Sequence, residues 1–548
     1  MGDGIGAAII FETHPERYRH WALRIDGDCA WLTLDVERFG GLDPSIELKG
    51  NSYDLSVDIE LADAVQRLRF EHPEVWVLVI GSAEERIFCS GANIHALARA
   101  THAHKVNFCK FTNETRLYLE EASAESGLHS IAACNGATAG GGYELALACD
   151  AIVLVDDGSS AVSLPEVPLL GVLPGTGGLT RLTDKRRVRP DLVDLFATLA
   201  EGVRGKRALD WRLVDQIVAR SRFDEAVAAR VDAARVVARS QGEGIALDAL
   251  EPMVSDGRID YRHVRVDLDR DRRVAEVVVA GPEGAQPEDG GEAHEAGAGW
   301  WPLRMARELD DALLRLRFNE PAIGLVLLRT RGDLEMVHRV GELLAGDGEC
   351  WLVRETRLLL GRVLRRLDLT ARSVFAIVDE NSCFAGPLFE LLLAADRTYV
   401  LDAPGVAVRA GSLSDGCLNR WNGLSRLATR FLDQPDRVAA VLEAGRCGAM
   451  AASDLEELGL ATELIDEIDF EDSVRIAVEE RASLSPDALT GMEASTRFGG
   501  PETMATKIFG RLSAWQNWIF SRPNATGEAG ALALYGRPER PRFEFTRT

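Results

Sequence analysis

The sequence predicts an α/β fold of two related units in tandem, followed by a helical C-terminal segment. Apolar runs such as VWVLVIG at 75–81 and SIAAC at 130–134 have the length and composition of buried strands, and YELALACD at 143–150 has helical spacing. A repeat supports the tandem arrangement, since RLRFEHPEVWVLVI at 67–80 recurs as RLRFNEPAIGLVLL at 315–328. A length of 548 residues also suits several domains.

The repeat continues further along the chain and sets the expected boundary between the units. SIAACNGATAGGGYELALACDAIVLV at 130–155 aligns with SVFAIVDENSCFAGPLFELLLAADRTYVL at 373–401. We therefore predict a first unit over residues 1–258 and a second unit over 259–489.

Two further segments stand apart from the repeat. The tract GPEGAQPEDGGEAHEAGAG at 281–299 is rich in Gly and Glu, which predicts a flexible acidic insertion on the surface of the second unit. The stretch ETMATKIFGRLSAWQNWIF at 502–520 has helical character, so residues 490–548 are expected to form a helical segment that packs back on the body.

Composition narrows the class of protein. A net charge of −24 disfavours nonspecific nucleic-acid binding, and no apolar run reaches the length needed to span a membrane. The nine cysteines form no CxxC pair and no leader pattern is evident, so a cytoplasmic location is expected. The ten histidines form no metal-binding motif, so no metal is expected.

A glycine turn is the most informative local feature. Gly140, Gly141 and Gly142 lie where a strand leads into a helix, and the first amides of a helix have no partner inside it. The Gly141 N–H can therefore point at a substrate oxygen that gains negative charge. A second donor is expected from Ala92, which follows a glycine in the segment FCSGANIHAL. Two such amides would form an oxyanion hole.

Two glutamates are placed to serve this turn. Glu144 lies in the first helical turn after Gly141, and Glu166 is expected to close the strand AVSLPEV. Taken alone, each Gly is best read as a turn residue and each Glu as a helix cap. Taken together they favour catalysis, because burial and a neighbouring charge keep one proton on a carboxylate pair near neutral pH.

These motifs resemble those of the crotonase (enoyl-CoA hydratase) superfamily over roughly residues 30–220. SGANI, the GGGYE turn and the PEVPLLGVLPGTGG run occur in the order and spacing typical of that superfamily. The resemblance implies crotonase-like ββα spiral units and a coenzyme A thioester as substrate. It assigns the thioester-oxygen amides to Ala92 and Gly141, and the acid and base to Glu144 and Glu166.

The resemblance also implies a set of substrate contacts. Residues 92–95, with Asn93, Ile94 and His95, are expected to line the coenzyme A groove, and Gly140 to contact the substrate. The superfamily often has Asp and Lys where this chain has Asn93 and His95. Lys49 lies in a loop where the superfamily often contacts coenzyme A, although a solvated lysine is an equal alternative.

Cys109 is a third candidate catalytic residue. It lies in the helical stretch VNFCKFTNETRL, a region from which crotonase relatives often send a residue over the substrate. A plain buried thiol is the competing interpretation, because free cysteine behaves as a small hydrophobic residue.

The second unit has lost the groups that would perform this chemistry. Pro387 stands at the place of Gly141 and has no N–H to donate. Gly411 stands where Glu166 would fall, and Glu390 remains without its partners. We therefore predict a degenerate second unit with a structural role.

The tandem arrangement and the C-terminal stretch together resemble the benzoyl-CoA-dihydrodiol lyase (2,3-epoxybenzoyl-CoA dihydrolase) family. That resemblance implies an aldehyde-lyase type enzyme that converts 2,3-epoxybenzoyl-CoA and two waters to 3,4-didehydroadipyl-CoA semialdehyde and formate. It implies no cofactor beyond the coenzyme A of the substrate, and a homodimer.

Two other functions remain open at this point. An ordinary enoyl-CoA hydratase acting on aliphatic acyl-CoA would share both glutamates, and turnover of crotonyl-CoA would identify it. In a noncatalytic acyl-CoA-binding protein the first unit would have lost its catalytic motifs, as the second unit has. The motifs of the first unit are intact in this sequence.

Overall fold

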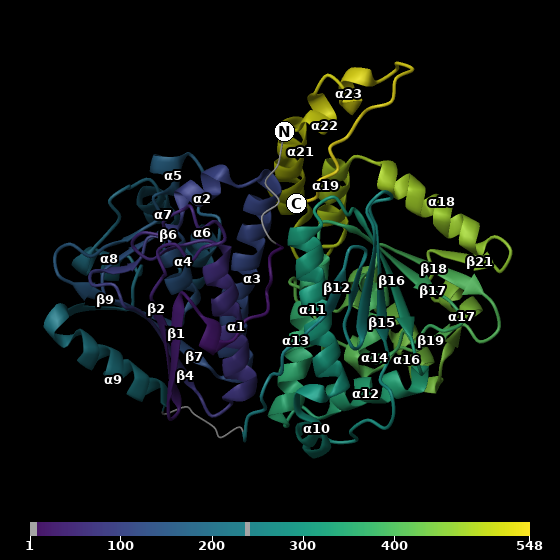
Figure 1. The fold of residues 1–548 in the computed structure, drawn as a ribbon, viewed down its shortest axis with the longest axis horizontal. Coiled ribbons are helices and arrows are strands. Elements are labelled where there is room, and N and C mark those ends of the chain that lie inside the picture. Colours follow the sequence, from purple (N-terminus) through teal and green to yellow (C-terminus); the bar gives the residue numbers. More distant parts are fainter. Residues whose placement is uncertain (1–7, 236–241) are drawn as a thin grey trace. The chain divides into compact units, whose positions relative to one another are not determined.

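The computed structural model describes residues 8–235 and 242–548. It divides into two units, Met1–Leu247 and Asp248–Thr548 (Figure 1). The division precedes the predicted boundary after residue 258, because two short strands, β12 (Met253–Ser255) and β13 (Arg258–Asp260), pair with the sheet of the second unit. The first seven residues of the segment inspected for a leader lie outside the described residues.

The first unit is built on a six-stranded sheet with the order β1-β2-β4-β7-β9-β11. β1 and β2 are antiparallel, and the other neighbouring strands are parallel. Val77, Ile131 and Val153 of the central strands pack against Val227 and Val231 of a covering helix. The strands are β1 (Trp21–Asp26), β2 (Cys29–Leu34), β4 (Val77–Ser82), β7 (His129–Cys134), β9 (Ala151–Asp156) and β11 (Gln216–Ala219).

Helices and two small parallel sheets complete the first unit. One small sheet has the order β10-β8-β5 and the other pairs β3 with β6. Their strands are β3 (Ser52–Tyr53), β5 (Ile87–Cys89), β6 (Gly91–Ala92), β8 (Ala137–Ala139) and β10 (Val162–Ser163). The helices are α1 (Leu55–Glu71), α2 (Ile94–Arg99), α3 (His102–Ser126), α4 (Gly141–Ala148), α5 (Glu166–Leu170), α6 (Gly178–Thr180), α7 (Pro190–Ala197), α8 (Gly205–Asp210) and α9 (Phe223–Arg235).

The second unit repeats this plan on an eight-stranded sheet with the order β12-β13-β14-β15-β16-β17-β18-β21. β14 and β15 are antiparallel like β1 and β2, and the neighbours β15, β16, β17, β18 and β21 run parallel. β19 and β20 form a separate antiparallel pair. Its strands are β14 (Val264–Asp269), β15 (Val274–Ala280), β16 (Leu325–Arg331), β17 (Ser373–Val378), β18 (Arg397–Asp402), β19 (Ala407–Val408), β20 (Met450–Ala451) and β21 (Glu463–Asp466).

The helices of the second unit follow the same order as those of the first and then continue into the C-terminal segment. They are α10 (Gly290–Ala296), α11 (Trp301–Asn319), α12 (Leu334–Gly346), α13 (Trp351–Asp368), α14 (Gly386–Ala394), α15 (Arg426–Arg430), α16 (Pro435–Cys447), α17 (Ala452–Glu457), α18 (Phe470–Ser483), α19 (Pro486–Thr496), α20 (Met504–Lys507), α21 (Ser513–Phe520), α22 (Pro523–Thr526) and α23 (Ala531–Leu534).

The repeat extends to individual hydrogen bonds. The Tyr18 hydroxyl donates to Asp63 over 2.5 Å in the first unit, and the Tyr261 hydroxyl donates to Asp311 over 2.7 Å in the second. In each unit the acceptor lies on the long helix that follows the antiparallel strand pair. Matching side chains at matching places support the prediction of two units that share one fold.

The tract 281–299 is more ordered than predicted, because it contains α10. The Asp289 side chain accepts hydrogen bonds from the backbone of Gly291 and Glu292, and Glu292 in turn accepts from the amide of Glu288. This reciprocal capping satisfies the first amides of a helix. The prediction of a flexible loop is therefore wrong for its second half.

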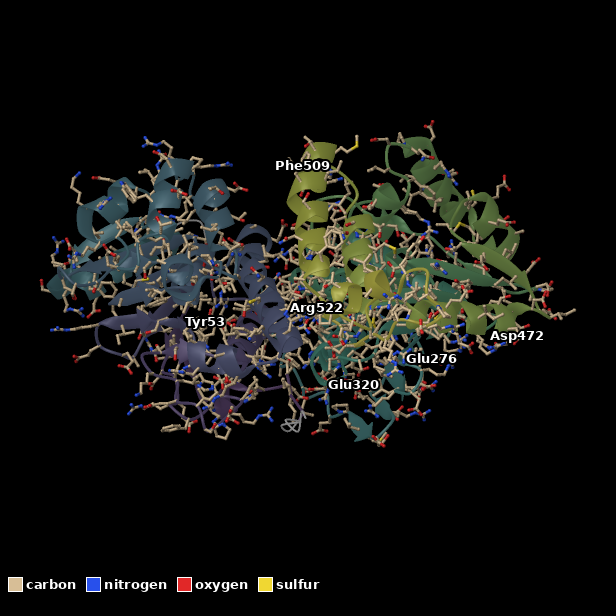
Figure 2. The ribbon with its side chains drawn as sticks, turned by 90° about the horizontal axis from the view of Figure 1, so that it is seen from above. Tyr53, Glu276, Glu320, Asp472, Phe509 and Arg522 are labelled. Atoms are coloured by element: carbon tan, nitrogen blue, oxygen red, sulfur yellow. The ribbon has the colours of Figure 1, made fainter. Side chains whose placement is uncertain are left out.

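The C-terminal segment is helical and packs on the second unit. α19 begins at Pro486, ahead of the predicted start at residue 490, and Asn524 holds the following turns by donating to Asp487 over 2.9 Å. Phe509, labelled in Figure 2, is 76% exposed. Throughout the described part of the chain, no helix is both long and apolar enough to cross a membrane.

Candidate active site

The glycine turn forms the N-terminus of α4. Gly140 is the N-cap and has φ 52°, a conformation that favours glycine. A side chain there would also meet Glu166, whose Oε1 lies 2.8 Å from the position a Cβ would take. Gly141 is the first helical residue, so its amide has no partner within α4. The predicted change from strand to helix is confirmed, with β8 immediately before the turn.

The second predicted amide lies beside this helix start. β6 pairs with β3, and the next amide along, that of Asn93, donates to the Tyr53 carbonyl over 2.8 Å. Successive amides of a strand point to opposite sides, so the Ala92 N–H points away from β3. Gly91 is packed so tightly that a Cβ there would lie 2.9 Å from the Gly141 nitrogen. This arrangement suits an oxyanion hole, which itself stays a prediction.

Tyr53 closes one side of the glycine turn. It was not among the site residues predicted from the sequence. Its hydroxyl lies 1.9 Å from the place of a Cβ on Gly141, so only glycine fits at that position. The ring is buried, and burial raises the pKa of its hydroxyl well above the ordinary value. Figure 2 labels Tyr53 among the side chains of the first unit. No spacing in the sequence connects Tyr53 to a glycine so far along the chain.

Glu144 is held rigidly by a loop ahead of α6. Its buried carboxylate accepts hydrogen bonds from the Thr176 amide over 3.0 Å, from the Thr176 hydroxyl, and from the Gly178 amide over 2.7 Å. Gly178 must lack a side chain, because a Cβ would lie 2.9 Å from the carboxylate. Both oxygens of Glu144 are therefore acceptors of fixed donors.

Glu166 is held far less firmly. It opens α5 rather than closing a strand, because β10 ends at Ser163 and Pro165 is the N-cap. Its Oε2 is buried and has no hydrogen-bond partner among the described residues. Burial raises the pKa of Glu166 to about 7, and the negative charge of Glu144 adds to the rise. Glu166 is thus poised to give or take a proton near neutral pH.

An apolar surface adjoins Glu166. Five large side chains in the next seven residues are exposed, and they are Val167, Leu169, Leu170, Val172 and Leu173. Single exposed apolar residues are ordinary, whereas a cluster marks a binding surface. This cluster, here called the apolar lip, suits an apolar acyl group beside the two glutamates.

The predicted groove residues differ in what they can offer. The buried Asn93 side chain caps α2 by accepting from the Ala96 amide, and its Nδ2 donates to the Glu47 carbonyl and the Ser52 hydroxyl. Its side chain is therefore occupied with structure. Ile94 and His95 are exposed on α2, as a groove contact requires. Their contact with coenzyme A stays a prediction.

Lys49 belongs to a small group of exposed cations near α2. Its side chain is 70% exposed and pairs with Glu47 over 2.9 Å. Arg38 also pairs with Glu47, and Arg99 at the end of α2 lies 3.8 Å from Asp43. Such cations offer the local positive rim that a phosphate-bearing ligand needs on a strongly acidic protein.

Replacing Lys49 by Met is expected to raise KM for an acyl-CoA about two- to fivefold, the range typical of an exposed ion pair. The dependence of KM on salt should weaken as well, because one screened attraction is lost. Initial rates at low and high ionic strength measure both effects. Lys206→Met is the control, since Lys206 is 83% exposed and also ion-paired but lies on α8. An equal effect in both variants would count against a role for Lys49.

Cys109 lies on α3 close to the loop that holds Glu144. Its Sγ is 3.1 Å from the place of a Cβ on Gly175, and Asn113 donates to the carbonyls of both residues. Burial raises the pKa of the Cys109 thiol to about 11, and the charge of Glu144 contributes. The thiol therefore stays protonated at neutral pH, which suits packing better than nucleophilic catalysis. Its catalytic role stays a prediction.

The corresponding part of the second unit lacks the oxyanion amide. Gly386 has φ 46° and matches Gly140, so Pro387 stands where Gly141 stands in the first unit. Glu390 is buried and accepts from the Ser414 hydroxyl over 2.6 Å. Its surroundings include Arg426, 3.6 Å away. This neighbourhood fits a structural role.

Gly411 stands where Glu166 would fall and has no carboxylate of its own, but Glu342 places a carboxylate beside it. Glu342 on α12 lies so near that a Cβ on Gly411 would be 2.6 Å from its Oε1. Its carboxylate accepts from the amide and the hydroxyl of Ser412, over 2.8 and 2.6 Å. Within the described residues, no group of three or more His, Cys, Asp or Glu side chains forms a candidate metal site in either unit.

Comparison with known proteins gives matches over part and over all of the chain. The enoyl-CoA hydratase/isomerase family model matches residues 48–265. A benzoyl-CoA-dihydrodiol lyase of Aromatoleum evansii is 52% identical over 547 residues, covering 99% of this chain and 98% of the relative. A carnitinyl-CoA dehydratase of Proteus mirabilis (strain HI4320) is 33% identical over 172 residues, 31% of this chain and 61% of that one. The crystal structure of carnitinyl-CoA hydratase from Mycobacterium avium, 25% identical, covers 40% of this chain and 77% of its own with a TM-score of 0.31.

Proposed function

Because the chain belongs to the benzoyl-CoA-dihydrodiol lyase family of the crotonase superfamily, we propose that it opens the ring of 2,3-epoxybenzoyl-CoA. Membership confirms the predicted family, the crotonase-like fold and the assignment as a carbon–carbon lyase. It also sets aside the noncatalytic acyl-CoA-binding alternative. The whole-chain similarity carries the proposal, because it extends through both units.

The proposed products are 3,4-didehydroadipyl-CoA semialdehyde and formate, formed with two waters. The amides of Ala92 and Gly141 donate hydrogen bonds to the thioester carbonyl oxygen and polarise the carbonyl. One glutamate takes a proton from water as the water attacks the ring, and the other gives a proton to the departing epoxide oxygen. The route uses water and protein groups, with coenzyme A carried by the substrate.

The surroundings of the two glutamates favour a particular division of these roles. Glu144 faces three fixed donors, which suits a carboxylate that accepts a proton from water. Glu166 has a raised pKa and a free oxygen, which suits a carboxylic acid that donates to the epoxide oxygen. We assign Glu144 as the base and Glu166 as the acid of the first step.

The later step uses the same oxyanion hole. Cleavage of the carbon–carbon bond leaves a negative charge on the carbon next to the thioester, and this charge is delocalised onto the thioester oxygen. The second water adds to the aldehyde carbon whose bond is broken, so that this carbon leaves as formate in the cleavage itself. The two amides hold the thioester oxygen of the resulting enolate, which then takes a proton on the carbon next to the thioester. The apolar lip beside Glu166 would cover the ring during these steps and limit the access of bulk water.

The assignment of Glu166 as the acid predicts the pH dependence of turnover. The active form is protonated, so kcat/KM should be level below pH 7 and fall about tenfold per unit above it. Initial rates with 2,3-epoxybenzoyl-CoA from pH 5.5 to 9 measure this. A rise of kcat/KM through pH 7 would assign Glu166 as the base instead.

The preference between two substrates tests the proposed function against the aliphatic hydratase. We expect kcat/KM for 2,3-epoxybenzoyl-CoA to exceed that for crotonyl-CoA by at least about 10³-fold. The reason is that the contacts an active site makes with its own substrate stabilise the transition state, and a substrate that fits poorly lacks those contacts. Both are measured with the same enzyme preparation. Efficient hydration of crotonyl-CoA without turnover of the epoxide would contradict the proposed function and support an ordinary enoyl-CoA hydratase instead.

A further inference from the structure

Tyr53 is tied to both amides that are predicted to form the oxyanion hole. β3 pairs with β6, and in that register Tyr53 lies directly opposite Ala92. Its hydroxyl reaches the other amide's residue, because it lies 1.9 Å from the position a Cβ would take on Gly141. The hydroxyl is therefore in contact with the Cα of the residue that begins α4. It lies beside the place where the two amides are expected to meet the thioester oxygen.

The Tyr53 hydroxyl has no hydrogen-bond partner within the described part of the chain. Tyr53 as a whole is 4% exposed, and its hydroxyl oxygen keeps some accessible surface. The partnerless Oε2 of Glu166 differs in this respect, since it is fully buried. Polar groups inside proteins are normally paired. A hydroxyl that is open to the site and unpaired is available to a bound molecule.

The ring of Tyr53 is held by two side chains of α3. Phe108 meets it edge-on, with the ring centres 6.1 Å apart, and the Arg116 guanidinium lies 5.9 Å from the ring centre. Arg116 is fixed in turn by Asp58 of α1, over 2.8 Å between Nη1 and Oδ1, and both of these side chains are buried. A group that packing already holds in place loses little freedom when a ligand binds. The hydroxyl is thus preorganised.

The surroundings of Tyr53 keep its hydroxyl protonated. Burial raises its pKa well above the ordinary value. The charge of Arg116 opposes the rise, whereas the charges of Asp58 and Glu144 add to it. A protonated phenol donates a hydrogen bond, and such a bond is stronger in a buried site than in water. Tyr53 is therefore suited to donate to an oxygen and not to act as a base.

The second unit lacks this hydroxyl as well as the amide. Counted from the repeated RLRF motif, Trp301 stands at the position of Tyr53. Its Nε1 donates to the Ala280 carbonyl over 2.9 Å, so the indole has no donor left to offer. Ala306 stands at the position of Asp58, so the carboxylate that fixes the arginine is lost too. The hydroxyl and its support occur in the unit that keeps the glycine turn.

We propose that the Tyr53 hydroxyl is a third hydrogen-bond donor to the thioester oxygen, beside the amides of Ala92 and Gly141. The proposal rests on the proposed function, since it adds to the oxyanion hole assigned there. Negative charge reaches the thioester oxygen as the carbon–carbon bond breaks, so a fixed donor binds the transition state more strongly than the substrate. Tyr53 is then a catalytic residue that speeds turnover and contributes little to substrate binding.

The carbonyl carbon of bound benzoyl-CoA reports this hydrogen bond directly. Benzoyl-CoA has the thioester and the ring but no epoxide, so it tests the oxyanion hole without turnover. Each donor to the carbonyl oxygen withdraws electrons from the carbonyl carbon and moves its NMR resonance downfield. With benzoyl-CoA labelled at that carbon, we expect the full-length wild type to shift the resonance downfield from its position in free benzoyl-CoA. Tyr53→Phe should bind benzoyl-CoA but lose part of the shift.

Steady-state rates with 2,3-epoxybenzoyl-CoA provide a second readout. Loss of one oxyanion donor typically costs about 10²–10³-fold in kcat, and with two amides remaining we expect Tyr53→Phe to lower kcat about 10–10²-fold with little change in KM. Tyr143→Phe is the matched control, because Tyr143 lies on α4 and its buried hydroxyl donates to the Leu213 carbonyl over 2.7 Å. It should leave both kcat and the carbonyl resonance like those of the wild type.

The results separate this proposal from the function on which it rests. A resonance shifted equally by the wild type and by Tyr53→Phe would overturn the proposal and leave a hole of two amides. An unshifted resonance with the wild type would overturn the oxyanion hole and the proposal together. A raised KM with an unchanged kcat in Tyr53→Phe would also overturn it, because Tyr53 would then serve binding alone. Loss of shift in Tyr53→Phe without turnover of the epoxide by the wild type would support the donor and contradict only the proposed reaction.

Discussion

Replacing Glu166 by Gln is expected to lower kcat/KM about 10³-fold while making the folded protein more stable above neutral pH. The amide keeps the shape of the carboxyl group but cannot give a proton to the epoxide oxygen, and general acid catalysis typically contributes about 10²–10⁴-fold. The gain in stability has a separate cause, which lies in the pKa of Glu166.

The sign of the stability change follows from that pKa. Folding raises the pKa of Glu166 from its ordinary 4.5 to about 7, so ionisation is easier in the unfolded chain. Below pH 4.5 both states are protonated and the group has no effect. As pH rises from 4.5 to 7 the wild type loses stability, and above 7 the loss is complete. Allowing for partial exposure, Glu166→Gln should gain about 1–2 kcal/mol at pH 8 and little at pH 5.

Urea unfolding at pH 5 and pH 8, with steady-state rates on the same samples, measures both effects. Glu342→Gln is the matched control, because Glu342 places a carboxylate beside Gly411 in the second unit. It should leave kcat/KM unchanged. A fall in activity with Glu342→Gln as large as that with Glu166→Gln would show that the second unit takes part in the reaction.

Replacing Glu144 by Gln is expected to lower kcat/KM about 10²–10³-fold and, unlike the change at Glu166, to destabilise the protein. The carboxylate accepts from two amides and one hydroxyl. A Gln side chain has only one acceptor oxygen, which can serve the two amides, so its NH₂ must face the Thr176 hydroxyl. That hydroxyl then accepts from the NH₂, and its own proton loses the carboxylate acceptor. One buried donor left without an acceptor costs about 1–3 kcal/mol.

The same unfolding and rate measurements apply to this variant. Thr176→Ser is its control, since serine keeps the backbone and hydroxyl donors to Glu144 and should retain most of the activity. An unfolding free energy of Glu144→Gln equal to that of the wild type would contradict the view that the loop ahead of α6 holds this carboxylate.

The sequence was sufficient to predict the parts of the site that are local in the chain. The glycine turn, Glu144 and the loss of the amide at Pro387 all follow from a strand that leads into a helix. The partners of the glutamates were not predictable, because Thr176 reaches Glu144 from 32 residues away. Tyr53 approaches Gly141 over a still longer separation. Such contacts depend on the packed fold rather than on spacing.

Two errors of detail had signals in the sequence that competing patterns concealed. Pro165 followed by Glu166 is typical of a helix start, yet the apolar run before it suggested a strand that continued. Asp289 and Glu292 have the spacing of a helix cap, yet the glycines around them suggested a loop. Asn93 also caps a helix, as an Asn before a helical pattern commonly does, and its predicted contact with coenzyme A stays a prediction.

The most direct test of the central claim is mass-spectrometric analysis of the products formed from 2,3-epoxybenzoyl-CoA, with formate assayed in the same reactions. We predict that the wild type and Glu342→Gln yield a ring-opened semialdehyde thioester and an equal amount of formate, and that Glu166→Gln yields neither at a comparable rate. Formate production that persists in Glu166→Gln would contradict the assignment of the site. An unreacted epoxide with the wild type would contradict the proposed reaction itself.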